Sequence, residues 1–366
     1  MAAASVVVIN YNYERFLRDA VASALGQGET VEVIVVDDGS TDGSVELIRS
    51  YGSRVTAVVQ ANAGQASAFT AGFAASSGEV VCFLDADDLL LPGTMASALA
   101  LFEAEPFAKL HWPLLEVDAA GRRLGGTNPP VPLPAGDLCE LLADRGPGAY
   151  PTPPSSGNAF SRSFLEQVMP VPGQLRVCAD GYLYDLAPLY GPVARLDRPG
   201  GAIRFHDDSN FMARRYDDRL PHSVRAHELT IPRMAERCRQ LGREPDEAGW
   251  RERSWPIRSQ RALDDIAEVI PASTPFILID GGRLGVEPTA GRRLVRLPEH
   301  TEDADAVTDL RRPRQAADLL VVTWPSFPWL DAMAGVRAEI RASYRPLLQN
   351  SRLRIYTRSS AGSSGC

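Results

Sequence analysis

Apolar runs alternate with helix-like segments along the first hundred residues of the chain. The run at 80–84 is apolar throughout, which is typical of a strand buried on both faces of a parallel sheet. Strand, helix and strand in succession imply right-handed crossovers, so the pattern predicts an α/β fold with a mostly parallel sheet flanked by helices. The predicted elements are strands at 5–9, 31–36, 55–60 and 80–84, with helices at 14–26 and 65–76.

The middle of the chain is less regular. We expect a strand at 109–117, a hairpin turn at 118–121 and an edge strand at 158–162. Stretches rich in Gly and Pro at 125–134 and 146–154 predict loops over one edge of the sheet. Further short helices are predicted at 163–168 and 181–190, and further strands at 193–196 and 202–205.

The rest of the chain divides into three segments. A polar helical pattern at 216–270 predicts a helical connecting segment, and a second alternation at 271–358 predicts a small α/β module. A Ser/Gly-rich end at 359–366 predicts a disordered tail. The module is expected to contain strands at 276–279, 319–322 and 351–356, with helices at 305–310 and 329–344.

Composition narrows the class of protein. The net charge of −8 argues against a general nucleic-acid or anionic-membrane binder. Five scattered cysteines without a C-x-x-C pair fit a reducing compartment and argue against disulfides and zinc. No basic n-region begins the chain, and no apolar stretch reaches the ~18 residues of a membrane span. We therefore expect a cytoplasmic protein, with peripheral association at the inner face of a membrane left open.

Acidic clusters follow two of the predicted parallel strands, at 37–38 and 85–88. The carboxyl ends of parallel strands meet at one edge of a sheet, where such folds bind ligands. Carboxylates that lie so close repel one another unless a cation bridges them, and oxygen ligands suit Mg²⁺ or Mn²⁺. The sequence thus predicts a divalent metal holding a diphosphate, with a solvated acidic turn as the alternative.

Five motifs in this region carry a resemblance. They are Ile9-Asn10-Tyr11-Asn12, Val36-Asp37-Asp38-Gly39-Ser40-Thr41-Asp42, Asn62-Ala63-Gly64, Ala75-Ser76-Ser77-Gly78-Glu79 and Leu84-Asp85-Ala86-Asp87-Asp88. In this order they resemble the family 2 glycosyltransferases, over residues 4–212. The resemblance implies a Rossmann-like GT-A fold for a catalytic domain at 1–215. It also implies a nucleotide-diphosphate sugar donor and a divalent metal.

The resemblance assigns the first motifs to the nucleotide. Tyr11 would stack on the base, although it could simply be a partly buried aromatic residue. Asp38 would accept a hydrogen bond from a base N–H, and Asp37 would reach the same pocket or the ribose. Either acid could instead cap the next helix, where Thr41 or Asp42 is the expected cap. The other residues expected at the nucleotide are Ile9, Asn10, Asn62 and Gly64.

The later motifs are assigned to the diphosphate. Asp85 and Asp87 form a D-x-D that would contact Mn²⁺ or Mg²⁺ between the two phosphates, and Asp88 could replace Asp85 as a ligand. In the segment 203–210, Arg204 could pair with the diphosphate and His206 could reach the metal or a phosphate.

One departure concerns the donor. The family often has an Arg-Asn pair after Asn62-Ala63-Gly64, where this chain has Phe69-Thr70. The departure puts the identity of the donor in doubt.

The resemblance places the general base at Asp180. The segment Cys178-Ala179-Asp180-Gly181 matches the family's acceptor side, with Ala179 in place of the first acid of its pair. One carboxylate must take the acceptor's proton in an inverting transfer. Asp180 could instead be the N-cap of a helix at 181–190, and Asp185 is a weaker candidate for the base.

Together these residues predict a metal-dependent inverting glycosyltransferase. The donor would carry UDP, dTDP or GDP, and the acceptor hydroxyl would belong to a saccharide or lipid-linked molecule in polysaccharide or glycoconjugate synthesis. The alternatives are a silent nucleotide-sugar binder and a sugar nucleotidyltransferase, although the latter would carry a Gly-rich loop where Asn10-Tyr11-Asn12 stands. In the C-terminal module, whose role is open, Trp324 and Trp329 could stack on sugars or pack in the core.

Overall fold

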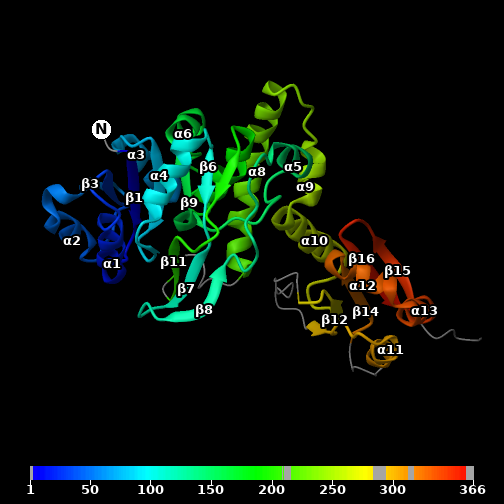
Figure 1. Ribbon diagram of the computed structural model, residues 1–366. Helices are drawn as coiled ribbons and strands as arrows, with labels where there is room; N and C mark the ends of the chain where they lie inside the picture. The colour runs from blue at the N-terminus through cyan, green and yellow to red at the C-terminus, as the bar shows by residue number, and fades with distance from the viewer. Residues whose placement is uncertain (1–2, 208, 210–215, 283–293, 312–316, 360–366) are drawn as a thin grey trace, which may run out of the picture. The chain divides into compact units, whose positions relative to one another are not determined.

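The computed structural model describes residues 3–207, 209, 216–282, 294–311 and 317–359 (Figure 1). It divides into a first unit, Met1–Arg215 with His222–Ser254, and a second unit, Tyr216–Pro221 with Trp255–Cys366. The helical segment expected at 216–270 is thus shared between the units. The tail expected at 359–366 lies outside the described residues except for Ser359. No helix in the described ranges is long and apolar enough to cross a bilayer.

The main sheet of the first unit has seven strands in the order β10-β6-β9-β4-β1-β2-β3. Pairing is parallel throughout except at β9, which runs antiparallel to both β4 and β6. The strands are β1 (Ala4–Asn10), β2 (Val31–Asp37), β3 (Thr56–Val59), β4 (Val80–Asp85), β6 (Lys109–His111), β9 (Asn158–Ser161) and β10 (Val193–Arg195). The expected α/β fold with a mostly parallel sheet is confirmed, but the edge position expected for 158–162 is wrong. Asn158, Ala159 and Phe160 are buried because β9 fills the interior of the sheet.

A second sheet of four strands lies in the same unit, in the order β5-β11-β7-β8. The strands are β5 (Leu89–Leu90), β7 (Leu114–Asp118), β8 (Arg123–Asn128) and β11 (Gly201–Phe205). The single strand expected at 109–117 is wrong, because β6 and β7 belong to different sheets. Pro113 lies between them and has no N–H to continue a ladder. The loop expected at 125–134 is also wrong in its first part, since β8 continues to Asn128.

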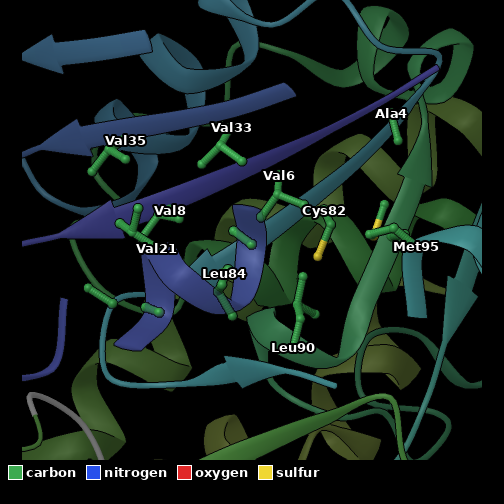
Figure 2. Packing of buried hydrophobic residues seen from close by; sticks show 14 of the residues in the cluster. Ala4, Val6, Val8, Val21, Val33, Val35, Cys82, Leu84, Leu90 and Met95 are labelled. Carbon is green, nitrogen blue, oxygen red and sulfur yellow. The ribbon is translucent and has the colours of Figure 1, made fainter. Parts of the chain in front are cut away.

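Helices cover the first unit's main sheet, and the core lies between them and the strands. Val6 and Val8 of β1 belong to the same buried cluster as Val21 of α1 (Figure 2). The helices of the unit are α1 (Glu14–Leu25), α2 (Ser44–Ser50), α3 (Gln65–Ala75), α4 (Thr94–Ala104), α5 (Cys139–Arg145), α6 (Arg162–Val168), α7 (Ala179–Leu186), α8 (Tyr216–Gln240, shared) and α9 (Glu247–Arg253). The cap expected at Thr41 or Asp42 is wrong, because Gly43 is the N-cap of α2, although Asp42 accepts the Ser44 N–H at 3.0 Å.

The second unit is a small α/β module, as expected. Its five-stranded sheet has the order β13-β12-β14-β16-β15, with β13, β12 and β14 parallel. The strands are β12 (Phe276–Ile279), β13 (Leu294–Arg296), β14 (Leu319–Thr323), β15 (Tyr344–Gln349) and β16 (Leu353–Arg358). The helices are α10 (Trp255–Val269), α11 (Asp303–Arg311), α12 (Phe327–Ala332) and α13 (Ala334–Ser343).

Two expectations for this module change. The single helix expected at 329–344 is wrong, because the extended backbone of Met333 (φ −88°, ψ 91°) separates α12 from α13. The two tryptophans pack within the module. Trp324 is 8% exposed and meets Trp255 edge to face, and Trp329 Nε1 donates to the His300 carbonyl at 2.8 Å. These contacts favour the core-packing alternative for both rings.

Candidate active site

A cleft of about 560 Å³ opens in the first unit where β1, β2 and β4 end. Because these strands are parallel neighbours, their carboxyl ends bring together residues that are far apart in the sequence. The predicted residues that line the cleft are Ile9, Tyr11, Asp38, Asn62, Gly64, Asp85, Asp87, Asp88, Asp180 and Arg204. Asn10, Asp37 and His206 are not among the lining residues.

Asp38 fixes the turn that forms one wall of the cleft. Its Oδ2 accepts the Gly64 N–H at 2.7 Å, and its Oδ1 accepts from Ala63 N at 2.9 Å and Gln60 Nε2 at 2.6 Å. Gly64 has φ 90°, and a Cβ there would lie 2.5 Å from the Arg176 Cα, so the turn requires glycine. Tyr11 is 37% exposed, which leaves its ring face available to a ligand.

Asn10 and Asp37 lie behind this wall and are completely buried. Asn10 Nδ2 donates to Asp37 Oδ2 at 2.8 Å, and the Ser40 N–H donates to Asp37 Oδ1 at 2.8 Å. Both oxygens of Asp37 are therefore engaged within the protein. The pair braces the turn after β2, from which Asp38 reaches the cleft.

The acidic cluster after β4 brings several carboxyl groups into mutual repulsion. Burial, followed by repulsion from Asp88, Asp87 and Asp180, raises the pKa of Asp85 well above its usual range. Burial and repulsion from Asp87 likewise raise the pKa of Asp88. Asp88 accepts from Ser156 Oγ at 2.6 Å and from Arg204 N at 3.0 Å, so each of its oxygens already has a donor. The remaining acceptor capacity of the cluster lies with Asp85, which has a hydrogen bond from the Ser155 side chain, and with Asp87.

Arg204 and His206 hold the cluster from β11 and the residue that follows it. Arg204 donates from Nε to the Asp87 carbonyl and from Nη1 to the Ala119 carbonyl, both at 2.9 Å. Its Nη2 lies 3.1 Å from Asp19 Oδ2. This arrangement favours a bracing role for Arg204. His206 Nε2 lies 3.1 Å from Asp87 Oδ2, so the imidazole contacts the second acid of the D-x-D directly.

The donor set can be compared with what a divalent cation needs. Among the described residues, no three His, Cys, Asp or Glu side chains are arranged to hold an ion by themselves. Mg²⁺ is usually held by one or two carboxylates and completed by substrate phosphates. Asp85 and Asp87 supply oxygen ligands and excess negative charge, and His206 supplies a nitrogen beside them. The residues fit a cation whose coordination is completed by a substrate.

Asp180 lies in the first turn of α7 and lines the same cleft. The N-cap of α7 is Cys178, so the N-cap alternative for Asp180 is wrong. The N–H groups of Ser155 and Gly181 donate to its carboxylate at 3.2 and 3.0 Å, and burial raises its pKa. Asp185 is 2% exposed, is not among the lining residues and accepts the Gly148 N–H at 2.9 Å.

Part of the lining was not predicted. Thr152 and Ser155 come from the expected loop at 146–154 and its end, and Tyr184 comes from α7. Ser223 and His227 lie on α8, whose polar pattern gave no signal of a site. His227 Nδ1 lies 2.9 Å from Ser254 Oγ, and burial lowers the pKa of its imidazole to about 4, so the ring is neutral near pH 7.

The departure at Phe69 has a structural explanation. Phe69 is completely buried and stacks on Phe83 with 4.3 Å between ring centroids, so it belongs to the core. Another segment supplies a positively charged side chain to the cleft. Arg176 lines the cleft and donates from Nη2 to Asn62 Oδ1. Arg176 stands in a segment without a motif, and sequence analysis did not identify it.

Comparisons with known proteins agree with the motifs. Residues 5–133 match the model of the family "Glycosyl transferase family 2". An uncharacterized glycosyltransferase of Nostoc sp. is 34% identical over 215 residues, which cover 57% of this chain and 66% of that protein. An undecaprenyl-phosphate 4-deoxy-4-formamido-L-arabinose transferase of Pseudomonas aeruginosa is 44% identical over 92 residues, covering 23% of this chain and 27% of that protein. The chain thus spans just under two thirds of the first relative and about a quarter of the second.

Among solved structures, S. aureus TarS 1–349 in complex with UDP aligns with a TM-score of 0.48 and 19% identity. The alignment covers 71% of this chain and 72% of that one.

Proposed function

Because the chain belongs to glycosyl transferase family 2, we propose that its cleft transfers a sugar from a nucleotide-diphosphate sugar to an acceptor hydroxyl. One observation carries the proposal. The cleft brings the nucleotide motif at Asp38, the D-x-D at Asp85 and Asp87, and the candidate base Asp180 to a single site. The mostly parallel sheet agrees with a GT-A fold.

The donor is proposed to bind along the wall formed by β1, β2 and β4. Tyr11 offers a ring face for the base, and the turn held by Asp38 offers backbone groups beside it. Asp85, Asp87 and His206 are the residues that would hold Mn²⁺ or Mg²⁺. Such a cation, when bound, supplies positive charge that stabilises the leaving diphosphate. The mutual repulsion of these acids supports this assignment, because a cation would relieve it.

Asp180 is proposed as the general base. Its carboxylate takes the proton of the acceptor hydroxyl as that oxygen bonds to the anomeric carbon. The bond from the anomeric carbon to the diphosphate breaks in the same step, and the nucleoside diphosphate leaves. Attack from the opposite face inverts the anomeric centre. The N–H groups of Ser155 and Gly181 hold the carboxylate in one orientation for this proton transfer.

The substrates are proposed by class. The donor carries UDP, dTDP or GDP, and the acceptor is a saccharide or a lipid-linked molecule in polysaccharide or glycoconjugate synthesis. The name of the P. aeruginosa relative supports the lipid-linked class. We also propose that the protein works in the cytoplasm, at the inner face of a membrane.

A turnover assay tests the proposal. The full chain is incubated with Mn²⁺, a panel of UDP-, dTDP- and GDP-sugars and candidate acceptors, and released nucleoside diphosphate is measured. We expect release from one donor class that depends on an acceptor and is lost in Asp180→Asn. Binding of a donor without release by the wild type would contradict transfer and favour a silent nucleotide-sugar binder.

A further inference from the structure

Lys109 is the only lysine among the thirty-eight basic residues of the chain, and its side chain is completely buried. Lysine is almost never fully buried unless its charge is balanced. A chain that uses arginine at every other basic position has a lysine only here, on the strand β6 within the main sheet. The position therefore calls for a compact ammonium group rather than for a basic residue in general.

The amine lies directly behind the part of the cleft that contains Asp180. Nζ donates to Thr152 Oγ1 at 2.6 Å and to Tyr150 Oη at 3.1 Å. The Tyr150 hydroxyl passes its own hydrogen bond on to the Tyr184 carbonyl at 2.6 Å. Thr152 and Tyr184 line the cleft, so Lys109 is one contact away from two of its walls.

Aromatic rings enclose the same amine. Nζ lies 5.0 Å from the ring centroid of Tyr150 and 5.4 Å from that of Tyr184, which are cation–π distances. The planar fork of a guanidinium group is wider than an ammonium group and needs more space. The enclosure by Thr152 and the two rings thus explains why arginine is not used at this position.

Two buried carboxylates, those of Asp185 and Asp180, interact electrostatically with the Lys109 amine. Burial lowers the pKa of the amine well below its usual range, and the charges of Asp185 and Asp180 oppose that effect only in part. The amine in turn opposes the rise that burial imposes on the pKa of Asp185, which reaches about 7.

The imidazole and the phenol groups near the amine carry no positive charge at neutral pH, and the nearest arginines are Arg195, which acts on His111, and Arg176, which lines the cleft. Burial and Lys109 lower the pKa of His111 to about 3. Burial raises the pKa of Tyr150 and of Tyr184 well above the usual range. Asp85, from β4, adds a further negative charge beside Asp180.

We propose that Lys109 is a positioning residue of the transfer site, whose ammonium group holds Thr152 and Tyr150 in place and balances the charges of Asp185 and Asp180. This inference rests on the proposed function in one respect, the role of Asp180 as base. Without the ammonium group, Asp185 and Asp180 would lose the buried cation that interacts with both of them. The walls formed by Thr152 and Tyr184 would also lose their common anchor.

A single lysine makes a direct measurement possible. Selective ¹³Cε and ¹⁵Nζ labelling of lysine gives one side-chain signal, which reports the ionisation of Lys109 through a pH titration of the full chain. We expect an ammonium signal at pH 7 in the wild type. We also expect the Lys109 pKa to fall by about one unit or more in Asp185→Asn and by a smaller amount in Asp180→Asn. Asp197→Asn, whose side chain is 84% exposed, is the matched control and should leave the signal unchanged.

A neutral amine at pH 7, or a Lys109 pKa that neither substitution moves, would overturn the proposal. This measurement needs no substrate, so it is decisive even where no donor has been found. It also remains available if a Lys109 variant fails to fold.

The kinetic test separates positioning from donor binding. In Lys109→Met we expect kcat to fall at least ~10-fold. The Kd for the nucleotide that binds with Mn²⁺ should stay within about twofold, because the residues proposed to bind the nucleotide, such as Tyr11 and Asp38, are unchanged. Lys109→Arg should not restore kcat, since the guanidinium group does not fit beside Thr152. Wild-type kcat in Lys109→Met would refute the inference alone, whereas wild-type kcat in Asp180→Asn would refute the base assignment.

Discussion

In each unit an aspartate stands at the end of a buried parallel strand, but the surroundings of the two aspartates differ. In the second unit, Asp280 follows β12, accepts the Gly282 N–H at 2.9 Å and lies 3.7 Å from Arg296 Nε. In the first unit, Asp85 ends β4 and faces Asp87, Asp88 and Asp180. Asp280 in the second unit has a guanidinium group beside it, whereas Asp85 in the first unit has three other acids around it.

The difference shows how a strand-end acid can be assigned. The charge of Asp280 is balanced within the module by Arg296, and its Oδ1 accepts the Gly282 N–H, although its buried Oδ2 has no hydrogen-bond partner among the described residues. Carboxylates that raise one another's pKa lose their repulsion only when one of them takes up a proton or when a cation binds between them. We therefore place the chemistry in the cleft of the first unit and assign Asp280 a structural role.

The largest effect is expected at the candidate base. Asp180→Asn removes the proton acceptor and keeps the shape, and its one amide oxygen can accept only one of the N–H groups of Ser155 and Gly181, so transfer should fall by about 10²- to 10⁴-fold. Nucleotide affinity should stay within about twofold, because Asp180 is not one of the residues proposed to bind the nucleotide. Rates from a nucleoside-diphosphate release assay and affinities from calorimetry check both statements. An unchanged rate would remove Asp180 from the mechanism.

The histidines of the two units offer a second contrast. His227 in the cleft has Ser254 Oγ at 2.9 Å and a pKa lowered to about 4, whereas His300 in the second unit lies 2.8 Å from Asp309 Oδ2. A lowered pKa in the folded state means that the stabilisation is complete above the unfolded value near 6.5. It is lost as the pH falls through about 4.

Between pH 7.5 and 4, the wild type should thus lose roughly 3 kcal/mol more of its unfolding free energy than His227→Gln. Denaturant unfolding at several pH values measures this difference, and His300→Gln serves as the comparison in the other unit. Parallel pH curves for the wild type and His227→Gln would contradict a buried neutral imidazole.

The D-x-D should control the metal-dependent part of binding. Asp87→Ala removes the D-x-D carboxylate that contacts His206 Nε2, so the gain in nucleotide affinity on adding Mn²⁺ should fall at least ~10-fold. Circular dichroism should show an unchanged fold, and Asp197→Ala provides an exposed control. An Mn²⁺ effect equal to that of the wild type would place the cation elsewhere.

The smallest effect on transfer is expected in the second unit. Asp280→Ala removes the acceptor of the Gly282 N–H and the partner of Arg296, which should cost about 1–3 kcal/mol of unfolding free energy. Transfer by the folded variant should stay within about twofold of the wild type. Loss of transfer without loss of stability would contradict the structural role assigned to Asp280.

The sequence predicts the first unit up to Asp85 closely, because alternating apolar runs and helical faces encode a parallel sheet directly. It fails where pairing depends on distant residues. The strand β9 is short enough to suggest an edge, yet it is inserted between β4 and β6. The break at Pro113 sends β7 to another sheet, which only the fold reveals.

The site shows the same limit. Strand-end motifs identify Asp38, Asp85 and Asp87 in the cleft, since Asp38 directly follows β2, Asp85 ends β4 and Asp87 lies two residues further on. They do not distinguish Asp37, which is buried behind the wall, from its neighbour Asp38. His227 and the buried contacts of Lys109 come from tertiary packing, which leaves no pattern along the chain.

Calorimetric titration of the full chain with UDP, dTDP and GDP, each with and without Mn²⁺, tests the central claim most directly. We predict that one of the three nucleotides binds, and that Mn²⁺ is required for tight binding. That result would establish the mutually repelling acids of the first unit as a cation-assisted nucleotide site. The absence of Mn²⁺-dependent binding for all three nucleotides would contradict the account.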